Sequence, residues 1–155
     1  MSEQRYFREI KFTVYGNPKA QKRHRMARRA KYVAQIDDSK EDKGNLLAQV
    51  IQYKPIAPWT GPIMLNISWV IARPKSHFRT GKHADELRAD APVFCHKKPD
   101  IDNLEKLLLD ALNGVFWLDD GQIAVVEKQK LYDPLPERPR TVVTVRRMTA
   151  EEAPR

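Results

Sequence analysis

The chain has 155 residues, the usual size of one compact domain, and its 28 Lys and Arg against 20 Asp and Glu give a net charge of +8. This basic balance favours a polyanionic partner such as a nucleic acid backbone. A single cysteine excludes an intramolecular disulfide. No apolar run approaches the roughly 20 residues that span a bilayer, and the polar start of the sequence is unlike a signal peptide. We therefore expect one cytoplasmic domain over residues 1–155.

The first predicted element is a strand in which Ile10, Phe12 and Val14 alternate with polar neighbours. A Gly-Asn-Pro turn ends this strand, and a basic segment without any acidic residue follows. We predict that this segment is a loop that contacts DNA through Lys19, Lys22, Arg23, Arg25, Arg28, Arg29 and Lys31. The alternative is a solvated run of like charges that binds nothing. Tyr32, at the end of the loop, could stack on a base or pack beneath the loop, and we expect it to pack.

A helix is predicted from about Ser39 to Tyr53, where Pro55 stops it. Alternating apolar residues predict a strand over Ile63–Ile71, with Trp69 in the core. Residues 73–98 lack hydrophobic periodicity, and loops of this length usually carry a function. We predict a flexible clamp that binds DNA through Lys75, Arg79, Lys82, Lys97 and Lys98. The other interpretation is a loop that stays solvated in the free protein.

The next helix carries most of the chemistry. Asp100 and Asp102 lie two residues apart in its extended lead-in, so their side chains point the same way. The helix is expected to begin near Asp102 and to bury one apolar stripe, which consists of Leu104, Leu107, Leu108, Ala111 and Leu112. Asp102, Lys106 and Asp110 share another face, and Asn113-Gly114 ends the helix.

The segment Asp119-Asp120-Gly121 predicts a turn, followed by strands near residues 122–132 and 141–147 and by a frayed tail over 148–155. Because the chain returns along the helix after this turn, we expect Asp119 or Asp120 to lie near Asp100 and Asp102. The element order is β-α-β-loop-α-β-β. It predicts an α+β fold in which two main helices cover one small mixed sheet.

Carboxylates gathered within a basic chain favour a hard cation held against a polyanion. Mg²⁺ prefers oxygen ligands and is bound by a few carboxylates together with phosphate and water. Such an ion activates water and polarises a phosphodiester, and Lys106 could stabilise the charge that develops on the phosphate. Three structural alternatives remain open: Asp102 and Glu105 as a capping box, Asp102 and Lys106 as a surface ion pair, and residues 119–121 as a turn only. Cys95-His96 lacks the ligand spacing of a zinc site.

Three consecutive motifs carry a resemblance to a known family. Asp100-Ile-Asp102-Asn-Leu-Glu-Lys106, then Asp110-Ala-Leu-Asn, then Trp117-Leu-Asp-Asp120-Gly-Gln122 is similar to the pattern D-x-D-N-L-x-K, D-A-L and W-x-D-D-x-Q of the RusA family of Holliday-junction resolvases. The match spans Lys97 to about Lys130, and a weaker similarity covers Phe12 to Pro18 and the basic run after it. The segment 73–98 looks like an insertion relative to the shortest members.

This resemblance implies a small homodimeric endonuclease, dependent on Mg²⁺ with Mn²⁺ as a substitute, that cuts four-way DNA junctions in recombination and repair and often occurs in prophages. Carried over by position, the metal-binding carboxylates are Asp100, Asp102 and Asp120, and the catalytic lysine is Lys106. The role of Asp119 stays open. Two alternatives remain: a metal-dependent nuclease for other branched DNA or for RNA, and a junction-binding protein that does not cut.

Overall fold

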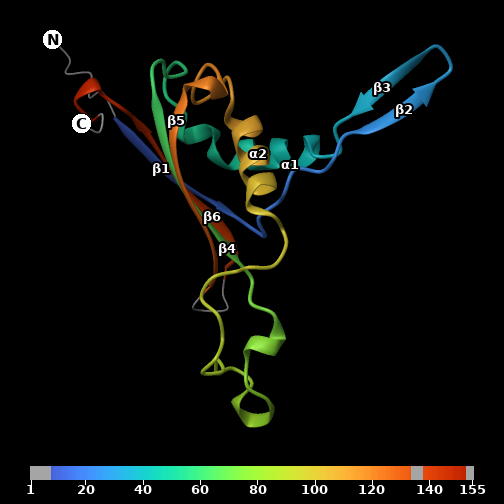
Figure 1. Ribbon diagram of the computed structural model, residues 1–155, viewed down its shortest axis with the longest axis vertical. Helices are drawn as coiled ribbons and strands as arrows, with labels where there is room; N and C mark the ends of the chain where they lie inside the picture. The colour runs from blue at the N-terminus through green and yellow to red at the C-terminus, as the bar shows by residue number, and fades with distance from the viewer. Residues whose placement is uncertain (1–7, 134–137, 153–155) are drawn as a thin grey trace.

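The computed structural model describes residues 8–133 and 138–152. Its centre is a four-stranded mixed sheet with the strand order β1-β6-β4-β5 (Figure 1). β6 lies antiparallel between β1 and β4, whereas β5 runs parallel to β4 along the edge. The strands of this sheet are β1 (Glu9–Tyr15), β4 (Ile63–Ile71), β5 (Ile123–Tyr132) and β6 (Arg140–Arg147).

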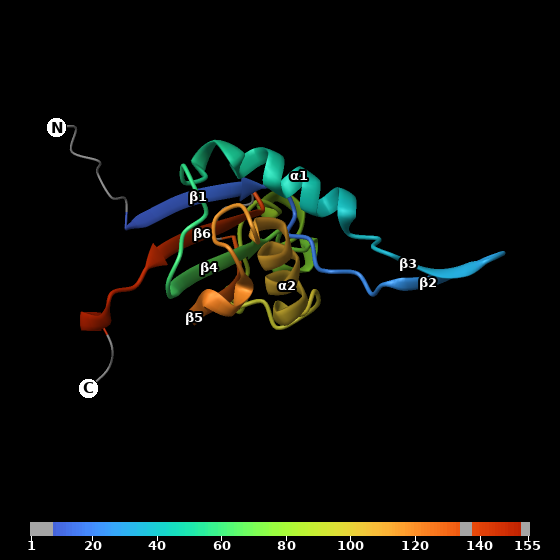
Figure 2. The same cartoon turned by 90° about the horizontal axis from the view of Figure 1, so that it is seen from above.

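Two helices, α1 (Lys40–Val50) and α2 (Ile101–Leu112), pack on the same face of the sheet (Figure 2). Alternate side chains of β4 point to this face, so that Ile63, Leu65 and Ile67 are fully buried and Trp69 is nearly so. The predicted apolar stripe of α2 lies against them and is buried along its whole length. Each of these isoleucine and leucine side chains contributes about 1.5–3 kcal/mol on burial. The mixed sheet and its two helices confirm the predicted α+β fold.

The first helix has nearly the predicted bounds. α1 begins one residue after Ser39, and a single 3₁₀ turn over Ile51–Tyr53 continues it to the expected end. Ser39 is fully buried but does not cap the helix. Its Oγ instead accepts a hydrogen bond from the backbone N–H of Lys22 at 2.8 Å, so the start of α1 holds the basic segment in place.

The basic segment differs from the predicted loop. Its second half forms a β-hairpin, which we call the arm, from β2 (Arg25–Arg29) and β3 (Tyr32–Ile36). These strands pair with each other and extend away from the sheet (Figures 1 and 2). The charges of β2 conceal the apolar alternation that identifies a strand. Tyr32 lies at the arm's tip with 63% of its surface exposed, so the expectation that it packs beneath a loop is wrong.

Residues 73–98 form a lobe that projects from one end of the sheet (Figure 1). Two 3₁₀ turns, over Lys75–His77 and Gly81–His83, and a bridge between Phe78 and Leu87 give it internal order. At its base the guanidinium of Arg73 donates to the carbonyl oxygens of Asp133 and Pro92 at 2.5 and 2.8 Å. These contacts show a folded lobe where the sequence predicted a segment without structure.

The end of the chain is also more ordered than expected. A 3₁₀ turn covers Ala150–Glu152, and the carboxylate of Glu152 accepts from Arg146 at 2.5 Å and from the backbone N–H of Thr149 at 2.7 Å. The frayed tail predicted from residue 148 is therefore wrong as far as residue 152, and residues 153–155 lie outside the described part. In the part of the chain that the structure describes, no helix is long and apolar enough to cross a membrane.

Candidate active site

The amino end of α2 presents two free carboxylates. The helix begins at Ile101, and Asp100 occupies the N-cap position, where its carbonyl oxygen accepts from Leu104 N–H at 3.1 Å and its side chain caps nothing. Asp102 is the second helical residue, so the capping box proposed for Asp102 and Glu105 is not formed. Both carboxylates are exposed, and among the described residues neither joins an ion pair or a side-chain hydrogen bond.

These carboxylates open into a hollow of about 650 Å³ between three segments. Asp100 and Asp102 come from α2, residues 128–130 come from β5, and residues 94–98 come from the end of the lobe. Lys97 and Lys98 are exposed on its wall. Two free carboxylates facing open space fit a Mg²⁺ ion, which takes one or two protein carboxylates and fills its other positions with water and phosphate oxygens.

Two lysines of β5 fix the wall of this hollow. The ammonium group of Lys130 donates to the carbonyl oxygen of Pro99 at 2.6 Å and also to that of Lys97. Lys128 forms an ion pair with Glu105 of α2. Sequence reasoning missed both residues, because their place depends on the register of β5 against β4, for which the local sequence carries no signal.

The face of α2 that carries Asp102, Lys106 and Asp110 divides into free and paired groups. Asp110 forms an ion pair with Lys43 of α1 at 3.2 Å, and Lys43 also binds Asp37 at 2.8 Å. Lys106 is exposed, and the surface ion pair with Asp102, which was the structural alternative, is absent from the described residues. Lys106 is therefore free to meet an external anion one helical turn from Asp102.

The carboxyl end of α2 is different, because its acidic turn is held by hydrogen bonds. A 3₁₀ turn covers Asp120–Gln122, and the Asp119 carboxylate caps it by accepting from Gly121 N–H at 2.9 Å. Gln122 returns the bond through its Oε1, which accepts from Asp119 N–H at 2.9 Å. A Cβ on Gly121 would lie 2.7 Å from the Asp119 carboxylate, which explains the glycine. Asp119 is thus a structural cap.

The remaining polar groups of this turn anchor it to the core. The amide of Gln122 donates to the carbonyl oxygens of Trp59 and Gly61 at 2.8 and 2.9 Å. Asp120 accepts through Oδ1 from the indole N–H of buried Trp117 at 2.8 Å. The motif W-x-D-D-x-Q is therefore a hydrogen-bonded turn in this structure.

Asp120 does not lie beside Asp100 and Asp102 within one chain. Asp100 immediately precedes α2, whereas Asp120 lies in the turn that follows the other end of this helix, and the 12 residues of α2 span about 18 Å. In the described residues no group of three or more His, Cys, Asp or Glu side chains could hold a metal ion. The expectation that the chain returns and brings Asp119 or Asp120 to the pair is wrong for the single chain. The strand that returns is β5, and its last residues, not the turn before it, reach the amino end of α2.

The base of the arm is tied to both helices. The backbone N–H of Gln21 donates to Asn103 O at 2.8 Å, next to Asp102. Arg25 binds the Asp38 carboxylate through two nitrogens, and this hydrogen-bonded ion pair holds the pKa of Asp38 below its ordinary value. The arm therefore has a fixed attachment beside the carboxylate pair.

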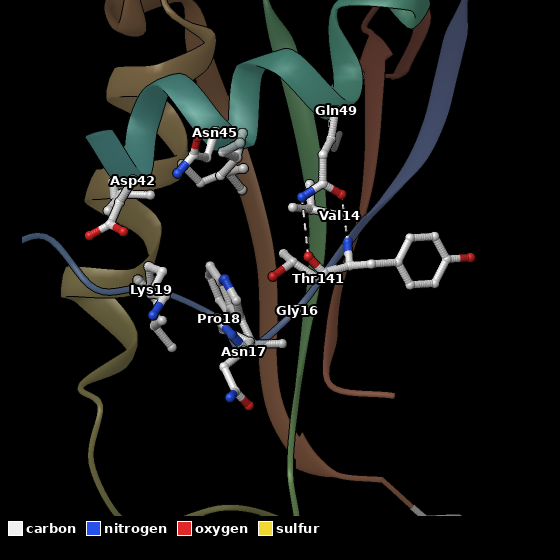
Figure 3. Close-up of a pocket in the computed structure, with 15 residues that line it drawn as sticks. Val14, Gly16, Asn17, Pro18, Lys19, Asp42, Asn45, Gln49 and Thr141 are labelled. Carbon is white, nitrogen blue, oxygen red and sulfur yellow. Dashed lines mark hydrogen bonds between the residues drawn. The ribbon is translucent and has the colours of Figure 1, made fainter. Parts of the chain in front are cut away.

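A second, smaller hollow of about 160 Å³ lies between the end of β1, the turn after it and α1 (Figure 3). Gln49 closes one side by exchanging two hydrogen bonds with the backbone of Tyr15, at 3.0 and 3.2 Å. Lys19 and Asp42 lie at the other side, where the basic segment begins. The hollow thus marks the junction between the sheet and the segment that leads to the arm.

The predicted DNA-contacting residues divide in the same way into free and paired groups. Lys22 pairs with Asp42 at 3.3 Å, and Arg79 pairs with Glu86 at 2.6 Å. Arg25 is engaged at the base of the arm. Of the predicted contacts, the exposed cations that form no ion pair among the described residues are Lys19, Arg23, Arg28, Lys31, Lys75, Lys82, Lys97 and Lys98.

Residues 15–146 match the family model described as "Endodeoxyribonuclease RusA". This chain belongs to the RusA endodeoxyribonuclease family. It is also 34% identical over 143 residues to the Bacillus subtilis (strain 168) protein named "Uncharacterized protein YqaN", and the alignment covers 91% of this chain and 98% of that protein. The RusA match confirms the resemblance and extends it from the three motifs to most of the chain. It supports a nuclease that acts on DNA.

Proposed function

We propose that this chain is a Mg²⁺-dependent endonuclease that resolves four-way DNA junctions by hydrolysing phosphodiester bonds. The observation that carries the proposal is the pair of free carboxylates, Asp100 and Asp102, in an open hollow walled by lysines in a member of a nuclease family. A bound Mg²⁺ supplies Lewis acidity and an activated water. Asp100 and Asp102 would hold the ion, with Mn²⁺ as a substitute.

The residues around this pair have complementary tasks. Lys97 and Lys98 attract the DNA backbone to the hollow, because exposed cations steer and bind phosphate. Lys106 stabilises the negative charge that grows on the phosphate during hydrolysis. Lys130 binds the carbonyl oxygen of Pro99 and so keeps Asp100 in position.

A homodimer explains how Asp120 can serve the reaction. In one chain this residue lies a helix length away from the carboxylate pair, so it can join the site only from a second copy. Its Oδ1 accepts from Trp117, which leaves its other oxygen for an external partner. A two-fold dimer also presents two equivalent sites, which matches a substrate with two equivalent strands to cut.

The proposed function is tested by incubating the protein with a four-way junction, a matched duplex and a single strand, each with Mg²⁺, with Mn²⁺ and with EDTA. We expect paired nicks near the branch point of the junction, only when a metal is present. Equal cutting of the duplex would contradict junction selectivity. Preferential cutting of other branched DNA or of RNA supports the first alternative, and tight junction binding without cutting in Mg²⁺ supports the second.

The shared site has its own test, in which two inactive variants are mixed. Asp102→Asn and Asp120→Asn chains are unfolded together, refolded and assayed on the junction. If the sites are shared, a mixed dimer contains one site with both native carboxylates, and nicking returns. If each site is built from one chain, every site in the mixture lacks one carboxylate and no nicking returns.

A DNA endonuclease has to work in the same compartment as its DNA substrate. We propose that it works in the cytoplasm of its host, in DNA recombination and repair, and that it is encoded within a prophage. Expression during prophage induction, compared with expression in a cured strain, tests the last point.

A further inference from the structure

The arm, residues 25–36, is the largest feature that the proposed chemistry leaves without a task. Its two strands pair only with each other among the described strands, and they extend into solvent (Figure 2). Its base, in contrast, is held by Gln21 to α2 and by Arg25 to Asp38. An isolated two-stranded ribbon has little intrinsic stability, so one that is fixed at its base and bare along its length is suited to meet a partner.

The register of the hairpin gives the arm two unlike faces. Met26 pairs with Gln35 and Arg28 pairs with Val33, so these four side chains share one face, which we call the Met26 face. The other face carries the two alanines, Ala27 and Ala34, at its centre. On that other face Arg25 and Ile36 lie toward the base of the arm and Tyr32 lies at its tip, so the Met26 face differs in having long side chains at the centre of the hairpin.

The Met26 face is unusual because large apolar groups are left in water. Met26 is 70% exposed and Val33 is 54% exposed, and Arg28 and Gln35 beside them are also exposed. These four residue types are those that contact base edges in the major groove: arginine binds guanine, glutamine binds adenine, and apolar side chains contact the methyl group of thymine. The major groove is wide enough to admit a two-stranded ribbon.

The charge of this segment favours a polyanionic partner, and membership of an endodeoxyribonuclease family favours DNA. Residues 19–31 contain seven Lys and Arg and no Asp or Glu, so the segment that leads to and forms the arm is attracted to a polyanion. Within it, Lys19 and Arg23 lie outside the Met26 face and are free to bind phosphate. An apolar and polar face bordered by cations is the arrangement in which phosphate contacts position the protein and base contacts specify the sequence.

We propose that the Met26 face enters the major groove of one arm of the branched DNA and reads base pairs there. Because Gln21 is bonded to Asn103, next to Asp102, the bases that the face reads lie at a fixed offset from the bond that is cut. The inference rests on the proposed function and adds to it a reader of sequence that is separate from the reader of branch structure.

The test uses four-way junctions whose arms carry random base pairs around the branch point, selected by binding in EDTA and then sequenced. The wild-type protein should enrich particular bases at a few positions. The double variant Arg28→Lys, Gln35→Ala keeps the net charge but loses the bidentate groups. It should lower the enrichment at those positions by on the order of tenfold.

The matched control is Arg23→Gln, which removes a cation outside the Met26 face. It should weaken binding to all sequences alike, reduce the log–log salt slope by about 0.9 and leave the enriched bases unchanged. Enrichment by the double variant equal to that of the wild type, or no enrichment by the wild type, overturns the inference. A Met26→Ser, Val33→Ser variant that turns a dimer into a monomer in light scattering also overturns it, because the face would then bind a second copy. Since selection is by binding, a protein that fails to cut refutes the proposed function without deciding this test.

Discussion

The two ends of α2 carry similar acidic residues in opposite states. At the amino end, Asp100 and Asp102 are exposed and form no ion pair or side-chain hydrogen bond in the described structure. At the carboxyl end, Asp119 caps a turn and Asp120 accepts a hydrogen bond from Trp117. A carboxylate that the protein leaves without a partner is available to a cation, whereas one that already accepts bonds from its own chain supports the fold.

The two motifs of the family pattern therefore differ in their structural state: one leaves its charged groups free, and the other builds a hydrogen-bonded turn. The motif D-x-D-N-L-x-K describes a helix start that leaves its charges free. The motif W-x-D-D-x-Q describes a turn whose groups bind one another and the carbonyl oxygens of Trp59 and Gly61. Substitutions of Asp100 or Asp102 should therefore lower the rate of cutting, whereas substitutions of Asp119 or Gln122, whose side chains bind their own chain, should lower stability.

The largest expected effect is at Asp102. Asp102→Asn removes a free carboxylate without removing any internal contact, so the folded protein should bind junctions as before and cut them at least about a hundredfold more slowly. Single-turnover cutting in Mg²⁺ measures the rate. The matched control is Asp110→Asn on the same helix, which breaks an ion pair with Lys43 outside the hollow and should keep the rate within a few-fold. Equal losses in both variants would place the chemistry elsewhere.

Lys106 provides a second test of the amino end of α2. Lys106→Met keeps the apolar stem and the helix propensity but removes an ammonium group that forms no internal ion pair among the described residues. We expect junction affinity close to that of the wild type and a cutting rate reduced on the order of a hundredfold. Cutting at the wild-type rate would show that the lysine serves only the surface of the helix.

Gln122 provides the test of the carboxyl end of α2. Gln122→Ala leaves the carbonyl oxygens of Trp59 and Gly61 and the N–H groups of Leu118 and Asp119 without their bonds. We expect the free energy of unfolding in urea to fall by about 1–3 kcal/mol. Gln129→Ala, which removes an exposed bond to Ser68, is the control and should change it much less. An unchanged stability for Gln122→Ala would mean that the turn does not support the fold.

The smallest expected effect concerns the lobe that walls the amino end. The ring of His77 packs edge-on against Tyr132, with centroids 4.7 Å apart, and burial together with the nearby Arg73 lowers the pKa of His77. As the pH falls, the imidazole of His77 is therefore protonated first in the unfolded chain, at a pKa of about 6.5. The stability that neutral His77 gives the folded protein is present above that pH and is lost as the pH falls below it.

Thermal unfolding at pH 7.5 and at pH 5.5 measures this dependence. The wild type should melt at a lower temperature at pH 5.5, and His77→Phe, which keeps an aromatic ring against Tyr132, should show a smaller difference. His83→Phe is the control, because His83 lies near the surface of the lobe beside Glu86. The same pH dependence in His77→Phe and the wild type would remove the role assigned to this histidine.

Periodic elements were predictable and tertiary placement was not. The apolar stripe of α2 and the alternation of β4 appear directly in the sequence, because burial on one face imposes a period. The hairpin was missed because Arg residues occupy its strand positions. The separation of Asp120 from Asp100 was missed because it depends on where β5 enters the sheet, which long-range pairing decides. Nor does a sequence tell which cations are free: Arg25 and Arg28 look alike, but only Arg25 has a carboxylate partner.

The order of strands in the sheet also decides when, during synthesis of the chain, the site can form. β1 is the first of the described strands to be made, and among them it pairs only with β6, the last of the described strands. β4 pairs with β5 only after the lobe and α2, which connect them, have been made. Long-range pairings of this kind form late. The nascent chain therefore carries its basic segment, and later its carboxylates, without a finished site until β6 has been made and can pair with β1 and β4.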